Sequence, residues 1–88
     1  MAYYLVERYV PSMSGADLAA AIRRVEDEAG DGVRHVWTVV VGAEDTCLSV
    51  FEGPDAESVR GVNLRAGFHL DRVVEVTSLS PGRRQGSD

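Results

Sequence analysis

The side chains that could bind a metal ion or move a proton are few in this chain. It holds two histidines, His35 and His69, and a single cysteine, Cys47. A closed four-ligand zinc site of the Cys/His type needs more of these residues than one chain provides. Two chains together would double the number, so the sequence permits a metal site shared between subunits.

His35 is the more interesting of the two histidines, because Trp37 follows it two positions later in the segment VRHVWTVVV. Alternate residues of a strand point to the same face, so we expect the imidazole and the indole to lie side by side. There His35 could ligate a metal ion or act as a general base beside an aromatic wall. The spacing equally fits an edge-strand histidine near solvent, with Trp37 at a subunit contact.

Two carboxylates are candidate partners of His35. Glu7 lies in an otherwise apolar strand segment, where an unpaired charge is costly, so it is either a metal ligand or acid/base group, or the partner of a neighbouring arginine. Glu52 ends the segment TCLSVFE. A four-residue turn would set Glu52 opposite His35, whereas a five-residue turn would send the two to different faces. The candidate metal ligands are therefore Glu7, His35 and Glu52.

The cysteine, the second histidine and one further glutamate are interpreted as residues without a role in chemistry. Cys47 lies within a strand segment, where a free cysteine usually behaves as a small buried hydrophobe. His69 follows Phe68 in a loop, where we expect it to be exposed. Glu75, in the run VVEV, is interpreted as a charge near the sheet edge. The sequence contains no phosphate-binding glycine loop and no HExxH or GxSxG motif.

The elements that must position these residues follow from apolar spacing and from the placement of glycine and proline. Strands are predicted over residues 2–10, 33–41, 46–52 and 72–79. Helices are predicted over residues 14–29 and 56–66. Ser14 with Asp17 three positions later predicts a capping box for the first helix, and Asp55 can cap the second.

The order strand, helix, strand, strand, helix, strand is that of the ferredoxin-like fold. It belongs to the α+β class and has a four-stranded antiparallel sheet with two helices on one face. Right-handed crossovers place the first and third strands at the centre of the sheet. We expect a single domain over residues 1–79 and, because no apolar residue could anchor it, a disordered tail over residues 80–88.

The other face of this sheet has no covering element. If Tyr4 points toward the helices, then Tyr3, Leu5 and Tyr9 point to the open face. A face this apolar is not expected to be left to solvent, and a second copy of the chain is the simplest cover. We therefore expect a homodimer, in which Tyr3, Tyr9 and Trp37 would line an enclosed small-molecule cavity.

The composition limits the classes of binding partner and the cellular location that we expect. Fourteen acidic residues against nine basic ones give a net charge of −5, and nucleic-acid binding would need a basic patch instead. A single cysteine excludes a disulfide-linked secreted scaffold. No apolar run approaches the ~20 residues of a membrane span. The sequence predicts a cytoplasmic protein with neither a nucleic-acid nor a membrane partner.

Three blocks of sequence, taken together, resemble a known family. They are YLVER at 4–8, TCLSVFEGPD at 46–55, and ESVRGVNLRAGF followed by DRVVEV at 57–76. They look like the small nickel-binding protein family long catalogued as a domain of unknown function, whose members are short, acidic, ferredoxin-like and dimeric. The resemblance implies a dimer that holds nickel, with Glu7 as the residue that carries over most directly.

The sequence departs from the family's pattern in the second helix and the second strand. Family members commonly carry a histidine in the second helix, where Val62 stands here. In the second strand the aromatic and the polar ring are exchanged, so that His35 precedes Trp37. The ligand set is therefore expected to differ from the family's while keeping the imidazole and carboxylate groups that suit nickel.

The resulting hypothesis is a small cytoplasmic protein that binds nickel or a similar divalent transition metal and needs no enzymatic activity. The alternative is a dimeric enzyme resembling the antibiotic-biosynthesis monooxygenases, with Glu7 or His35 acting as a base in a cavity over the open face. A third hypothesis is an interaction module without a ligand.

Overall fold

The computed structural model describes residues 1–30 and 32–77 and shows the predicted order of elements. The strands are β1 (Ala2–Tyr9), β2 (Arg34–Val41), β3 (Thr46–Gly53) and β4 (Arg72–Val76). The helices are α1 (Gly15–Glu28) and α2 (Ala56–Arg65), with a short 3-10 turn, η1 (Gly42–Glu44), between β2 and β3. The predicted tail at residues 80–88 lies outside the described residues.

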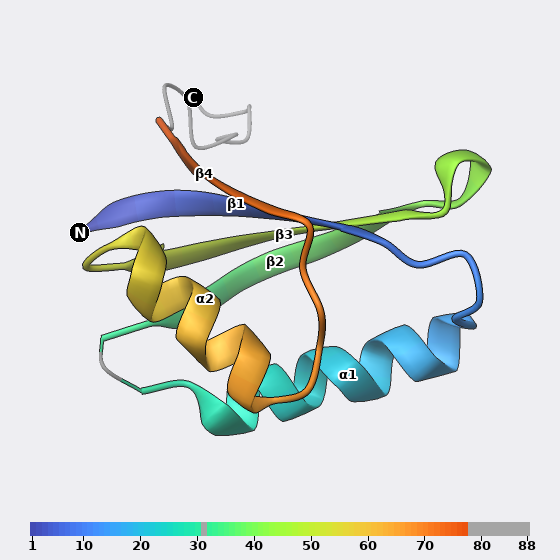
Figure 1. Cartoon of the computed structure of the whole chain (residues 1–88), viewed down its shortest axis with the longest axis horizontal. Coiled ribbons are helices and arrows are strands. Elements are labelled where there is room, and N and C mark those ends of the chain that lie inside the picture. Colours follow the sequence, from blue (N-terminus) through green and yellow to red (C-terminus); the bar gives the residue numbers. More distant parts are fainter. Residues whose placement is uncertain (31, 78–88) are drawn as a thin grey trace, which may run out of the picture.

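The strands form one antiparallel sheet in the order β2-β3-β1-β4. Both helices lie on the same side of it (Figure 1). This confirms the ferredoxin-like α+β fold, with β1 and β3 at the centre. The other side of the sheet has no covering element from the described part of the chain, and we call it the open face. No helix among the described residues is long and apolar enough to cross a membrane.

The capping box predicted for α1 is present. The Ser14 hydroxyl accepts a hydrogen bond from the Asp17 backbone N–H at 3.1 Å, and the Asp17 carboxylate accepts one from the Ser14 backbone N–H at 3.1 Å. These bonds satisfy donors that a helix start would otherwise leave unpaired. The helix then buries the apolar side of its surface, which consists of Leu18, Ala21 and Val25.

Asp55 caps helix α2, which packs closely on the sheet. The Asp55 carboxylate accepts a hydrogen bond from the Ser58 backbone N–H at 2.7 Å, and this bond lowers the pKa of Asp55. Gly53 at the end of β3 allows the close approach, because a Cβ there would lie 3.1 Å from a methyl group of Val59. After α2, Gly67 takes a positive φ of 77° and turns the chain back toward the sheet.

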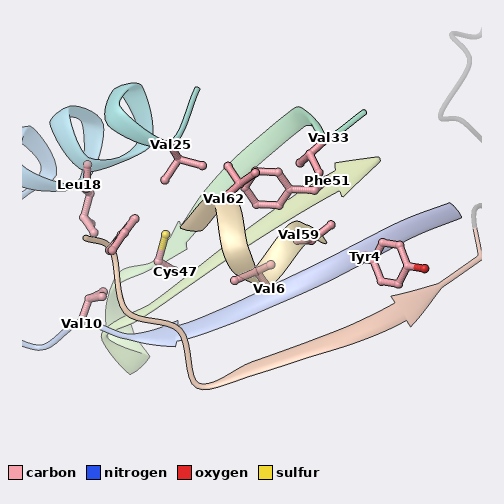
Figure 2. Close-up of a cluster of buried hydrophobic side chains, with 12 residues drawn as sticks. Tyr4, Val6, Val10, Leu18, Val25, Val33, Cys47, Phe51, Val59 and Val62 are labelled. Carbon is pink, nitrogen blue, oxygen red and sulfur yellow. The ribbon is translucent and has the colours of Figure 1, made fainter. Parts of the chain in front are cut away.

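The core lies between the sheet and the helices (Figure 2). Tyr4 and Val6 point into it from β1, which confirms the predicted assignment of the two strand faces. Cys47 is a free, fully buried thiol among these apolar side chains, as predicted. The other members of the core are Val10, Leu18, Ala21, Val25, Val33, Phe51, Val59, Val62 and Phe68.

A charged residue, Arg8, is completely buried in the same layer. Its guanidinium stacks on the Phe68 ring, 3.9 Å from the ring centroid. One terminal nitrogen donates to the Asn63 side-chain oxygen at 2.8 Å, and the other donates to the His69 carbonyl at 3.3 Å. Arg8 thereby joins β1 to α2 and to the loop that follows it. Burial lowers the pKa of Arg8, while the neighbouring Cys47 raises it.

Asn63 is the side-chain partner on which this arrangement depends. It is itself fully buried, and its amide nitrogen donates to the Val59 carbonyl at 2.8 Å, which fixes the oxygen toward Arg8. Within the described part of the chain, the Arg8 Nε has no hydrogen-bond partner. Loss of the Asn63 oxygen would therefore remove the side-chain amide acceptor of a buried cation and leave it with a backbone carbonyl, an aromatic ring and the neighbouring Cys47.

We predict that Asn63→Ala lowers the free energy of unfolding by about 1–3 kcal/mol, the cost of leaving a buried polar group unsatisfied. Denaturant unfolding measures it. The control, Arg60→Ala on the exposed side of the same helix, should change stability by less than about 0.5 kcal/mol. In an Arg8→Met background the Asn63 substitution should cost less, and equal costs in both backgrounds would contradict the coupling.

We also predict that Asp55→Ala lowers the thermal unfolding midpoint, whereas Asp55→Asn, which keeps a capping oxygen, retains most of it. Because the native pKa of Asp55 is depressed, its contribution is present above the unfolded-state pKa. It should disappear as the pH falls through the lower native value. Thermal melts across the acidic range test this, and equal pH profiles for the wild type and Asp55→Ala would contradict it.

Candidate functional site

The open face is apolar along its middle and charged at two corners. A row of four apolar side chains crosses all strands, and the register places in it Trp37, Val50, Leu5 and Val74. Trp37, on edge strand β2, is 46% exposed. The charged side chains at these corners form ion pairs with one another. The apolar row therefore determines the polarity of this face.

The three aromatic residues predicted to line a cavity all lie on this face but do not converge. Tyr3 is opposite Glu52, and Tyr9 is opposite Thr46 at the other end of β1. The two tyrosines are six positions apart along the strand, which corresponds to about 20 Å. Within one chain they therefore lie at opposite ends of the open face, and the cavity that they would line between two copies stays a prediction.

Glu7 lies on the open face in an ion pair. Its carboxylate accepts a hydrogen bond from Arg72 at 3.0 Å, across the β1–β4 ladder. Of the two interpretations left open by the sequence, the structure shows the arginine partner. The pair is partly exposed, so it neutralises the carboxylate with little effect on stability.

Glu52 is paired in the same way at another corner of the open face. One of its oxygens accepts from two nitrogens of Arg34, at 2.7 and 3.1 Å. Glu7 is opposite Leu48, four residues before Glu52 on β3, which separates the two carboxylates by about 13 Å along the strand. They cannot bind one ion together within one chain.

His35 does not share a face with Trp37, and the prediction that it does is wrong. The hairpin has the four-residue turn that would put His35 opposite Glu52, because Val41 pairs with Thr46. A bulge between His35 and Trp37 shifts the register, so His35 pairs with Phe51 and Arg34 pairs with Glu52. An extra residue in a strand moves every residue beyond it to the other face. His35 therefore points toward α1, away from the open face.

The imidazole of His35 is held in place on that side. Its side chain is only 11% exposed, and its ring lies against Phe51 with centroids 5.3 Å apart. Nδ1 lies 2.8 Å from a carboxylate oxygen of Glu26, near the end of α1. Nε2 lies 2.7 Å from the hydroxyl of Thr38. Both ring nitrogens thus have polar partners, one facing solvent and one facing the protein.

Nothing in the sequence pattern indicated Glu26 or Thr38 as partners of His35. Glu26 belongs to a run of three acidic residues at the end of α1, which looks like an ordinary solvated helix end. Thr38 stands three positions after His35, so simple alternation places the two on opposite faces. Only the bulge at Val36 brings them together.

His69 lies in an exposed loop, as predicted. Its Nε2 lies 3.0 Å from the Tyr9 carbonyl and 3.8 Å from the carboxylate of Asp71. That carboxylate accepts a short hydrogen bond from the Tyr9 backbone N–H, at 2.6 Å. This histidine and its carboxylate fasten the loop to the end of β1.

Two hollows formed by described residues lie beside α1. A groove of about 240 Å³ separates this helix from the edge of β2, with Ile22 and Leu18 on the helix and Thr38 and Val40 on the strand. A shallower one of about 460 Å³ lies along the alanine-rich side of the helix. Thr38 therefore borders the first groove while contacting His35.

The described residues contain no group of three or more histidine, cysteine or acidic side chains close enough to hold a metal ion. They contain two imidazole–carboxylate pairs, His35 with Glu26 at 2.8 Å and the more exposed His69 with Asp71 at 3.8 Å. These are ligand types that divalent nickel accepts. Val62, the position at which the resemblance led us to expect a difference in ligands, is wholly buried in the core.

Comparisons with known proteins identify a family and a solved structure of similar fold. A family model described as nickel responsive protein SCO4226-like matches residues 4–76. Among solved structures, the fold is similar to the crystal structure of SCO4226 from Streptomyces coelicolor A3(2), with a TM-score of 0.80. That match covers 90% of this chain and 100% of the other at 24% identity, so it supports the fold. No curated protein matches the chain.

Proposed function

The chain belongs to the SCO4226-like family of nickel responsive proteins, and we propose that it binds nickel, or a similar divalent transition metal, through His35 and Glu26. The resemblance to a small nickel-binding family noted in the sequence is confirmed by the family match. Metal binding by this chain, its ligands and its assembly are our proposals.

The observation that carries the proposal is the position of His35. Its ring is fixed by Phe51 and by the Thr38 hydroxyl, which leaves Nδ1 directed at the carboxylate of Glu26. Glu26 is about half exposed, with a side-chain exposure of 51%, so an ion has access to the pair. A ligand histidine usually has its second nitrogen held by a neighbouring group, and Thr38 provides that group here.

This pair supplies part of a coordination sphere. Water or groups from a second copy would supply the remaining ligands. The other two predicted ligands, Glu7 and Glu52, remain predictions. Each would have to leave an arginine partner and act on the opposite face of the sheet from His35.

We further propose that the protein is a homodimer packed through the open face. The support is the apolar row that runs from Trp37 to Val74 without a charge, because a contiguous apolar patch commonly marks a protein–protein contact. The ion pairs at the corners need no partner from the second copy. We place this dimer in the cytoplasm, where a free thiol such as Cys47 is the ordinary state of cysteine.

We predict that wild type binds Ni²⁺ in isothermal titration calorimetry near neutral pH. His35→Ala should weaken the affinity at least tenfold, because even the loss of a group that only supports a metal ligand typically costs about 10- to 100-fold. Glu26→Gln keeps the side chain's shape and removes its charge, and it should also weaken binding. Circular dichroism checks that each variant is folded.

His69→Ala is the matched control, because it removes the chain's other imidazole from an exposed site. It should leave the affinity within about twofold, since a surface substitution away from the site has little effect. The proposed site is wrong if His69→Ala weakens binding while His35→Ala does not. The absence of nickel binding by wild type would refute the proposed function as a whole.

The dimer is tested by light scattering coupled to size-exclusion chromatography. Twice the chain mass of 9.5 kDa gives an expected mass of about 19 kDa. Trp37→Lys places a charge on the open face and should yield the monomer. Val40→Lys is the control, because Val40 is also half exposed on β2 but points to the helix side. Equal masses for the two variants would contradict packing through the open face.

A further inference from the structure

The outer edge of strand β2 offers unpaired backbone groups to another strand. Within the described part of the chain, β2 has β3 as its one neighbouring strand. Every second residue of an edge strand presents its N–H and C=O groups outward, where a further strand can bind them. Charged residues and proline commonly protect such an edge, but residues 36–43 (VWTVVVGA) contain neither. The regular part of this edge, residues 37–41 beyond the bulge, is therefore open to pairing.

An apolar groove lies beside this edge, on the side of the sheet that carries the helices. It has a volume of about 240 Å³, and Val40, which is 50% exposed, borders it. Side chains directly opposite one another on paired strands have Cβ atoms about 4.5–5.5 Å apart. Side chains of an added strand opposite Thr38 and Val40 would therefore enter the groove. The residues that line it are all uncharged: Gly15, Leu18, Ala19, Ile22, Thr38 and Val40.

We propose that the β2 edge and this groove together bind an extended segment of another protein, which adds a fifth strand to the sheet. The backbone groups of β2 supply hydrogen bonds that any extended chain can make. The groove selects aliphatic side chains at alternate positions of the segment. The regular edge at residues 37–41 matches a segment of about five residues. This inference needs no metal ion and goes beyond the proposed function.

The charges at the two ends of the edge favour a segment with basic residues on either side of its apolar positions. At one end, Glu44 and Asp45 come directly after β2 and are exposed. At the other end, Glu26 lies 2.8 Å from His35. The arginine pair at residues 23–24 borders the shallower hollow along the alanine-rich side of α1. Complementary charge orients a partner and suppresses wrong ones, so arginine or lysine suits both ends of the bound segment.

A second copy of the chain fits this edge less well, because it would bring the same acidic groups. If two β2 strands paired antiparallel, the start of each would lie beside the end of the other. Glu26 of one copy would then approach Glu44 and Asp45 of the other. Like charges brought together in this way oppose association. The uncharged edge therefore suits a basic, apolar segment from a different protein.

The first test is calorimetry with the end-blocked peptide RVSVSVR, in buffer with EDTA so that no metal takes part. The wild type should bind this peptide. It should not bind RVSPSVR measurably, because proline cannot continue a paired strand. The acidic-ended peptide EVSVSVE should bind about 2- to 30-fold more weakly, the loss of two exposed ion pairs. Failure of the wild type to bind RVSVSVR, or equal binding of RVSPSVR, would overturn the inference and leave the nickel titration unaffected.

The matched variants are Val40→Lys and Leu64→Lys, which replace exposed apolar side chains on the edge and on α2. Val40→Lys should bind RVSVSVR about 4- to 10-fold more weakly, because a half-exposed valine is no longer available for burial. Leu64 is 56% exposed and does not line the groove, so Leu64→Lys should stay within about twofold of the wild type. Equal affinities of Val40→Lys and the wild type would refute binding at this edge.

The second test follows amide hydrogen exchange of β2 by NMR. RVSVSVR should slow the exchange of alternate backbone amides between Trp37 and Val41, because an added strand accepts hydrogen bonds from them. A contact made only by side chains in the groove would not do this. Unchanged exchange with the peptide bound would refute strand addition. Alternate amides already protected without peptide, together with a mass above that of two chains, would show that a second copy occupies the edge and would also overturn the inference.

Discussion

One extra residue in β2, Val36, decides which side of the sheet His35 occupies. Without it, the four-residue turn would align His35 with Glu52 on the open face. With it, Arg34 takes that place and closes an ion pair with Glu52, while His35 turns toward α1. A bulge commonly serves to re-aim a side chain in this way. The nickel site we propose, with Glu26 and Thr38 around the imidazole, exists only in this register.

A buried cation, Arg8, joins the sheet to helix α2. Arg8 brings a charge into the apolar layer, where its desolvation is unfavourable, and recovers part of that cost through Asn63, the His69 carbonyl and the Phe68 ring. All three contacts come from one stretch of chain, residues 63–69, which lies 55 to 61 positions after Arg8. They fix α2 and the loop that follows it at one end of β1, opposite the region where α1 meets His35.

The two sides of the sheet therefore have separate roles in the proposed function. The open face carries the aromatic and apolar side chains, with its carboxylates held by arginines, and it suits packing against a second copy. The helix side carries the histidine, its carboxylate partner and the hydroxyl groups, at the edge where β2 meets α1. A substitution on the open face should alter assembly without entering the coordination of the ion.

The sequence by itself determined the element order, the caps of both helices and the assignment of the faces of β1, because these depend on local periodicity and on the residues next to each helix start. It also indicated the family and identified His35 as a candidate ligand. Only the tertiary structure decided which side chains meet it. A bulge leaves no mark in the alternation of residues, and the partners Glu26 and Thr38 come from separate elements. The same holds for Arg8: alternation places it with Tyr4 and Val6, but its acceptor Asn63 is supplied by a helix 55 residues away, and no local pattern records that contact.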